Sequence, residues 1–267
     1  MAERITVPKF TARKSKGRKL VMVTCYDATF ARLVDRTHVD AVLVGDSLGN
    51  VIQGHETTIP VTLEDVIYHT RAVSRGLHHP LLVADLPFMT YQTSVAEALR
   101  NSGRLMQEGR AHAVKLEGGV RVAETVRTIV ETGIPVMGHI GLTPQSVHGF
   151  GGYRIQGRGD AAAKRLIDDA QALQDAGVFS IVLEGIPTAL AKEISNLLEV
   201  PTIGIGAGPH CDGQVLVLYD LLGMDESFSP RFVKQYANLS QTVGEALEAF
   251  VGEVREGKFP EEKHSFD

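Results

Sequence analysis

The chain has 267 residues, a length typical of a (β/α)₈ barrel or of one large α/β domain, and long enough to bury a sizeable core. Its net charge of −5 argues against a nucleic-acid-binding protein, which usually carries a basic face. The two cysteines form no CxxC pair, so neither a zinc site nor a disulfide framework is indicated. No apolar run approaches the roughly 20 residues that span a membrane, and we expect a cytoplasmic protein.

The first 19 residues or so precede any strand pattern and lack the apolar core of a signal peptide. Their basic segment, residues 13–19, is expected to be a solvated arm. Eight short apolar runs rich in β-branched residues then follow along the chain. They show no polar–apolar alternation, which fits parallel strands covered on both faces. The expected strands are residues 20–25, 41–44, 80–84, 111–116, 134–137, 179–183, 201–205 and 214–218.

Helical patterns with start and stop signals lie between these runs. Ser94 and Glu97 have the spacing of a capping box, and the helix that follows is expected to run to residue 108, before Gly109. Asp160 is expected to cap a helix that reaches residue 176. The further expected helices are residues 62–76, 120–131, 187–198 and 230–252. Strand–helix alternation predicts a parallel sheet, and eight repeats favour a closed (β/α)₈ barrel over an open sheet.

No linker or compositional break divides the chain. We therefore expect one barrel domain over residues 1–267, with an N-terminal arm of about 1–19 and a C-terminal helical extension of about 225–267. That extension could dock on a neighbouring subunit. Two long segments, residues 49–60 and 142–159, follow strand ends, where long loops shape the active site of a barrel.

Acidic residues stand at the ends of four expected strands: Asp46, Asp85, Glu117 and Glu184. In a barrel these ends meet at one mouth, where several buried carboxylates repel one another. Either they bind protons or a cation lies among them. Oxygen ligands without a cysteine cluster or an HExxH helix favour Mg²⁺. The alternative is that each acid caps a strand or pairs with a basic side chain.

Three other residues near these strand ends could bind a substrate. Lys115 points to the same side of its strand as Glu117. It could hold the negative charge of a carboxylate or enolate, form a Schiff base, or only pair with Glu117. His139 could donate a hydrogen bond to a substrate or simply be satisfied at the mouth. Ser47 could hold a carboxylate oxygen. The glycine-rich run 204–208 resembles a phosphate cradle, but the spacing favours small residues that admit a ligand or loop.

These residues lie in longer motifs, which together resemble the ketopantoate hydroxymethyltransferase family from about residue 24 to residue 236. The motifs are VGDSLG at 44–49, ADLPF at 84–88, VKLEGG at 114–119, GHIGLTPQ at 138–145 and IGIGAG at 203–208. The resemblance implies a (β/α)₈ barrel of the phosphoenolpyruvate/pyruvate superfamily. It also implies a homo-oligomer, a decamer in the family. The family transfers a hydroxymethyl group from 5,10-methylenetetrahydrofolate to 3-methyl-2-oxobutanoate, giving 2-dehydropantoate for pantothenate and coenzyme A biosynthesis.

The resemblance also implies a role for each site residue. Asp46 and Asp85 would hold Mg²⁺ and the substrate bound to it, with Glu117 in the same metal site, directly or through water. Ser47, Lys115 and His139 would contact the substrate, and Glu184 would be the proton acceptor. Two positions depart from the family's pattern, since Arg110 replaces a usually small residue and Gly185 a usually larger one. The alternatives are a Mg²⁺-dependent carbon–carbon lyase or phosphonomutase of the same superfamily, and a barrel retained only for binding.

Overall fold

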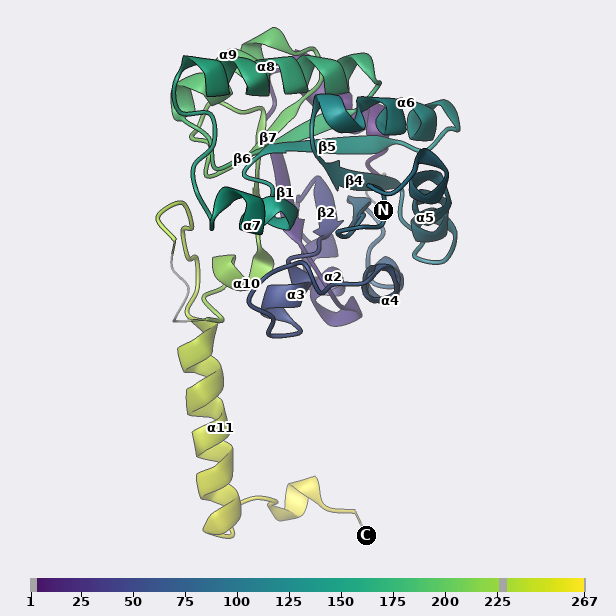
Figure 1. The fold of residues 1–267 in the computed structure, drawn as a ribbon. Coiled ribbons are helices and arrows are strands. Elements are labelled where there is room, and N and C mark those ends of the chain that lie inside the picture. The colour runs from purple at the N-terminus through teal and green to yellow at the C-terminus, as the bar shows by residue number, and fades with distance from the viewer. Residues whose placement is uncertain (1–3, 226–229, 267) are drawn as a thin grey trace. The chain divides into compact units, whose positions relative to one another are not determined.

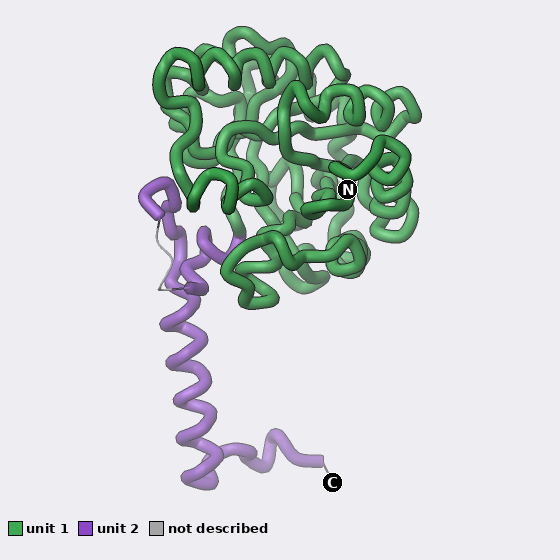
Figure 2. The backbone as a smooth tube through the Cα atoms, viewed as in Figure 1, with its two compact units in different colours: residues 1–217 green, residues 218–267 purple. Residues whose placement is uncertain are grey.

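The computed structural model describes residues 4–225 and 230–266. By its internal contacts the chain divides into two compact units, Met1–Val217 and Leu218–Asp267 (Figure 2). The first unit contains every strand of the described residues (Figure 1). Within those same residues, no helix combines the length and apolar character needed to cross a membrane.

The strands of the described residues form a closed parallel barrel, in chain order from β1 to β8. β1 pairs with β2 on one side and with β8 on the other, which closes the ring. All eight expected strands are present: β1 (Leu20–Thr24), β2 (Ala41–Val44), β3 (Leu81–Asp85), β4 (Ala113–Glu117), β5 (Val136–Gly141), β6 (Ser180–Glu184), β7 (Thr202–Ile205) and β8 (Gly213–Leu216). The predicted (β/α)₈ barrel is therefore confirmed.

Helices cover the outside of this barrel (Figure 1). The helices of the first unit are α1 (Val7–Ser15), α2 (Ala28–Asp35), α3 (Leu48–Val51), α4 (Leu63–Ser74), α5 (Val95–Gln107), α6 (Ala123–Glu131), α7 (Val147–Phe150), α8 (Asp160–Asp175) and α9 (Thr188–Leu197). Short 3₁₀ turns are η1 (Val120–Val122) and η2 (Pro144–Ser146). The second unit contains α10 (Leu218–Leu221), α11 (Leu239–Arg255) and the turn η3 (Glu262–His264). Because helices cover the outer face and side chains fill the interior, β3 and β4 are buried along their whole length.

The N-terminal helix packs against the barrel, so the expected solvated arm is wrong for Arg13 and Lys14, whereas residues 15–19 are exposed as expected. Phe10 of α1 is fully buried and meets Phe179 edge to face, with ring centroids 5.8 Å apart. Burying a phenylalanine side chain contributes roughly 1.5–3 kcal/mol. Arg13 and Lys14, which were expected to lie free in solvent, instead pair with Asp40 at 2.6 Å and Asp212 at 2.9 Å. The amphipathic helix α1 therefore closes the core at this end.

Two helix starts differ from the expected caps. Ser94 accepts the backbone N–H of Glu97 as predicted, but the Glu97 carboxylate bonds to the Thr93 hydroxyl, so only half of the capping box forms. Asp160 is the first residue of α8, with Gly159 at the capping position. A complete capping box forms at the start of α4, between Thr62 and Asp65. The polar residues at the helix starts thus predicted where the helices lie. Which hydrogen bonds those residues form depended on neighbouring side chains.

The largest differences in element boundaries are at β5 and α11. β5 continues to Gly141, past the expected end at residue 137, because Gly138 provides room for Leu173 of α8 and does not end the strand. His139 therefore lies inside the strand. In the second unit, α11 begins at Leu239 and not at residue 230. The Asn238 side chain accepts the N–H of Gln241 and caps the helix there.

Candidate active site

The carboxyl ends of β2 to β6 bring the predicted site residues into one cluster. Asp46 and Ser47 follow β2, Asp85 ends β3, Lys115 and Glu117 belong to β4, His139 to β5 and Glu184 to β6. All except Ser47 and Glu184 are buried. Each buried charge lies beside one of opposite sign or accepts a hydrogen bond. The arrangement has the convergence expected of a barrel mouth.

Lys115 supplies a positive charge inside this cluster. Its Nζ lies 2.8 Å from Asp85 Oδ1 and 3.3 Å from His139 Nδ1, and the residue is only 3% exposed. Burial alone would lower the pKa of Lys115, but the carboxylates of Asp85 and Glu117 outweigh it and raise the pKa. The ammonium group therefore stays charged at neutral pH. This argues for binding negative charge and against the Schiff-base role, which needs a neutral amine.

The negative charges of the Asp46 and Asp85 carboxylates together exceed the single positive charge of Lys115. Burial first, and then the charges of Asp85 and Glu117, raise the pKa of Asp46 well above its ordinary value. Burial also raises the pKa of Asp85, although Lys115 opposes the change. The backbone N–H of Asp46 donates to Asp85 Oδ2 at 3.2 Å. A cation between these groups would relieve their repulsion.

Two buried oxygens of the cluster fit such a cation. Asp85 Oδ1 and Glu117 Oε1 accept no well-aligned hydrogen bond from the described residues, although Lys115 and His139 lie at ion-pair distance from them. Within the described part of the chain, no three His, Cys, Asp or Glu side chains form a completed ligand set. Mg²⁺ commonly takes one or two carboxylates and fills its other positions with water and substrate oxygens. The donor chemistry therefore fits Mg²⁺ held by few protein ligands.

His139 joins this acidic group to Glu184. Its Nδ1 lies 3.4 Å from Glu117 Oε1, and its Nε2 lies 3.2 Å from Glu184 Oε2. Burial and the charge of Lys115 would lower the pKa of His139, but Glu117 and Glu184 outweigh them and raise it. The Glu184 side chain is 18% exposed, so it reaches solvent at the edge of the cluster. Glu184 is thus accessible to a substrate and oriented by His139.

Two further residues, without an expected role, hold the acids in place. The Gln145 side-chain amide donates to Asp46 Oδ2 at 2.9 Å, and its backbone N–H donates to Glu117 Oε2 at 3.1 Å. The Tyr91 hydroxyl accepts the N–H of Glu117 at 3.1 Å and lies 2.9 Å from Gln145 Oε1. Gln145 ends the GHIGLTPQ motif, so the sequence indicated that this residue could belong to the site. The sequence around Tyr91 carried none.

Ser47 has a local partner of its own. Its Oγ lies 2.9 Å from the Tyr26 hydroxyl, and either oxygen can be the donor. The residue is half-buried, beside the fully enclosed Asp46. The side chain is thus held at the edge of the cluster, where its hydroxyl can meet a polar group of a ligand.

Glycines allow the backbone to pack closely at Glu184 and in the run 204–208. Gly141 has a φ of +97°, and a Cβ there would lie 2.2 Å from the backbone oxygen of Glu184. Gly185 also has a positive φ, +55°, in the left-handed region that favours glycine. A Cβ at Gly208 would meet Thr188 Oγ1 at 2.5 Å. Close packing thus accounts for glycine at 208, in agreement with the small-residue interpretation of run 204–208.

Solved structures similar to this one share its fold. A 2,3-dimethylmalate lyase, described as a member of the PEP mutase/isocitrate lyase superfamily, has a TM-score of 0.63 and 16% identity, covering 100% of this chain and 90% of that one. A phosphonopyruvate hydrolase in complex with oxalate and Mg²⁺ has a TM-score of 0.63 and 13% identity, covering 98% and 92%. These likenesses show that the chain shares the barrel fold of these enzymes.

Sequence comparison identifies relatives of much higher identity than these solved structures. The 3-methyl-2-oxobutanoate hydroxymethyltransferase of Pelobacter propionicus is 55% identical over 267 residues, covering 100% of this chain and 99% of that protein. The enzyme of the same name from Moorella thermoacetica is 56% identical, covering 98% of each chain. The family model of ketopantoate hydroxymethyltransferase matches residues 4–262. The chain therefore belongs to the ketopantoate hydroxymethyltransferase family of enzymes.

Proposed function

We propose that this enzyme transfers a hydroxymethyl group from 5,10-methylenetetrahydrofolate to 3-methyl-2-oxobutanoate, giving 2-dehydropantoate for pantothenate biosynthesis in the cytoplasm. The observation that carries the proposal is the placement of Glu184. This accessible carboxylate lies 3.2 Å from His139, at the edge of a buried cluster of acids around Lys115. A base beside a site for negative charge is what enolate formation from a 2-oxo acid requires.

The acids of the cluster are the proposed metal ligands. Asp46 and Asp85 would hold Mg²⁺ and the substrate bound to it, and Glu117 would belong to the same metal site, directly or through water. Gln145 donates to Asp46 and Glu117, and so keeps both carboxylates directed into the site. When bound, Mg²⁺ polarises the carbonyl of the 2-oxo acid and stabilises negative charge on its oxygen.

The remaining residues bind and deprotonate the substrate. Ser47 and His139 would donate hydrogen bonds to it, and the Lys115 ammonium would balance the charge that develops on the oxygen. Glu184 would take the proton from the carbon next to the carbonyl, breaking the C–H bond. The electron pair of that bond then forms the new carbon–carbon bond to the one-carbon unit of the folate. Water supplies the hydroxyl group, and tetrahydrofolate leaves.

Proton exchange on the substrate tests the role of Glu184. In D₂O with Mg²⁺, the wild-type enzyme is expected to exchange the proton at the carbon next to the carbonyl of 3-methyl-2-oxobutanoate, followed by ¹H NMR. The Glu184→Gln variant is expected to lose at least about 100-fold in this rate, since general base catalysis typically contributes 10²–10⁴-fold. Calorimetry should show that the variant still binds Mg²⁺ and the oxo acid. Exchange at a near-normal rate would remove Glu184 from this role.

The folate requirement distinguishes the proposal from its alternative. A Mg²⁺-dependent carbon–carbon lyase or phosphonomutase would share the acids and the enolate but would need no one-carbon donor. We expect formation of 2-dehydropantoate to depend on 5,10-methylenetetrahydrofolate, with no cleavage of 2,3-dimethylmalate or rearrangement of phosphonopyruvate. Turnover of either of those compounds without folate would favour the alternative. We also propose a homo-oligomer, a decamer as the family resemblance implies.

A further inference from the structure

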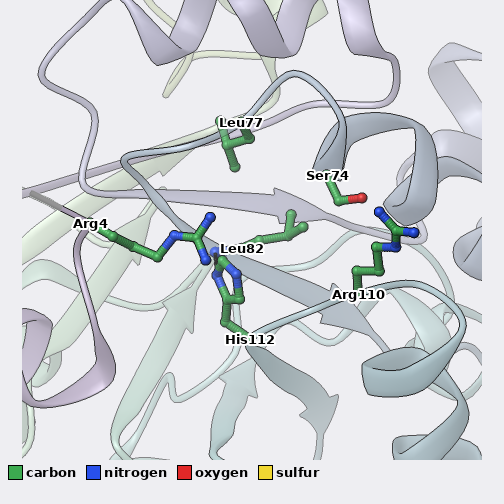
Figure 3. Close-up of a pocket in the computed structure, with 6 residues that line it drawn as sticks. All are labelled: Arg4, Ser74, Leu77, Leu82, Arg110 and His112. Carbon is green, nitrogen blue, oxygen red and sulfur yellow. Dashed lines mark hydrogen bonds between the residues drawn. The ribbon is translucent and has the colours of Figure 1, made fainter. Parts of the chain in front are cut away.

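A second polar site lies at the amino-terminal ends of β3 and β4, whereas the catalytic cluster lies at their carboxyl ends. It is a cavity of about 200 Å³, shown in Figure 3. The residues that line it are Arg4, Ser74, Leu77, Leu82, Arg110 and His112. Two arginines and a histidine line the cavity, and among residues 4–225 and 230–266 no carboxylate does so. The cavity is therefore electropositive.

Most of the donor groups of the two arginines are unused. Arg4 Nε donates to the backbone oxygen of His78 at 3.0 Å, while its terminal nitrogens bond to nothing within residues 4–225 and 230–266. In the same described residues, the Arg110 guanidinium makes no hydrogen bond or ion pair. The nearby carboxylate of Glu108 is already paired, with Arg104 at 2.7 Å. The two guanidinium groups are thus available to a ligand.

The histidine adds a donor with a defined tautomer. His112 Nδ1 accepts the backbone N–H of Leu82 at 3.0 Å, so in the neutral ring the proton must be on Nε2. Burial and the charge of Arg4 lower the pKa of His112, which keeps the ring neutral. In Figure 3 the guanidinium of Arg4 lies beside this ring, and Arg110 lies at the other side of the cavity. The Nε2–H group is therefore a fixed neutral donor.

Arg110 also has an unusual backbone conformation. Its φ is +63°, in the left-handed region, where a residue with a side chain is less stable than glycine. The chain thus carries a strained arginine at the rim of a cationic cavity. Strain of this kind is concentrated at sites with a function.

We propose that this cavity binds a phosphate group, either as free phosphate or as the phosphate of a small monoester. Two positive charges match the charge of a phosphate dianion. Guanidinium groups donate paired hydrogen bonds to phosphate oxygens, and the His112 Nε2–H can donate to a third oxygen. The Ser74 hydroxyl donates to the backbone oxygen of Arg71 at 3.0 Å. Ser74 therefore lines the cavity but does not donate to the anion.

The test is titration of the full-length protein with inorganic phosphate in Mg²⁺-free buffer, followed by calorimetry. Arg110→Gly removes the guanidinium and also relieves the backbone strain, so the variant is expected to be at least as stable to heat as the wild type. Its affinity for phosphate should fall at least about tenfold, the usual effect of losing a charged hydrogen-bond donor. Arg4→Gln should show a similar loss.

Arg165→Ala is the matched control, because Arg165 is an exposed arginine of α8 outside the cavity. It removes the same net charge and should leave phosphate affinity unchanged. Absence of saturable binding to the wild type, or equal weakening by Arg165→Ala and Arg110→Gly, would overturn the proposal. Acetate binding as tightly as phosphate would overturn the choice of ligand. Methyl phosphate identifies the source, since a site for monoesters binds it as well as phosphate and a site for free phosphate binds it more weakly.

Discussion

Lys115 supplies a buried positive charge to the acidic cluster of the candidate site. Its ammonium lies 2.8 Å from Asp85 and is buried with three acids of the same site. Removing a partner from a buried ion pair is costly, because it leaves the other charge unbalanced. The cluster thus tolerates its density of carboxylates only with the lysine present, and a divalent cation would add to this balance.

At the scale of a residue, Gln145 provides a test of the proposed metal site. Gln145→Leu removes the amide that donates to Asp46 but keeps the approximate volume of the side chain. We expect Mg²⁺ affinity to fall about 10–100-fold, the usual effect of losing a group that orients a metal ligand. Isothermal titration with Mg²⁺ measures this change. Asp85→Ala should abolish saturable binding in the same titration, and exposed His148→Ala should leave it unaltered. Wild-type affinity in Gln145→Leu would contradict the positioning role.

At the scale of an element, the short helix α10 contains a buried acidic residue outside the cluster. Asp220, in α10 of the second unit, is 8% exposed. Burial, and then the charge of Asp225, raise the pKa of Asp220 to about 6. The unfolded chain has a value of about 3.9 for such a group. Because the folded state disfavours the charged form, ionisation of Asp220 lowers stability as the pH rises from about 4 to about 6.

Asp220→Asn should remove this dependence. The variant is expected to be more stable than the wild type at pH 8, by about 1–2 kcal/mol once partial solvent screening is allowed for. The difference should shrink as the pH falls through 6 and vanish near 4, where the wild-type carboxyl is protonated. Urea denaturation between pH 4.5 and 8 measures it. A difference that is constant over this range would show that Asp220 does not titrate with a raised pKa.

At the scale of the whole molecule, α11 presents an unusual surface. Within this helix no residue is buried, and its apolar side chains recur at helical spacing. They are Val243, Leu247, Phe250, Val251 and Val254, each 42–59% exposed. An apolar stripe of this length marks a protein–protein contact more often than a free surface. We expect it to pack against another copy of this chain in the proposed oligomer.

Charges placed in this stripe should disrupt the assembly. Leu247→Glu combined with Phe250→Glu is expected to reduce the mass of the particle toward the 28.9 kDa of one chain, measured by sedimentation. Glu248→Gln, on the same helix but not in the stripe, is the control and should keep the wild-type mass. An unchanged mass in the double variant would show that α11 does not contribute to assembly.

The sequence by itself determined the barrel and indicated most residues of the candidate site. Continuous apolar runs predict buried parallel strands, and acids that end such runs must meet at one mouth, so the cluster of Asp46, Asp85 and Glu117 followed from local pattern. The sequence also placed the helix starts, because polar capping residues act over three or four positions. The predicted start of α11 was wrong, since helical composition continues across residues 230–238.

Only the tertiary structure decided which distant residues support these groups. Gln145 and Asp46 are 99 positions apart, and no periodicity connects them. The same holds for Arg4 and Arg110, which line one cavity from separate segments of the chain. The ion pairs of α1 likewise depend on acids elsewhere in the barrel. Secondary structure follows from short-range patterns, whereas hydrogen bonds between remote side chains exist only once the barrel has closed.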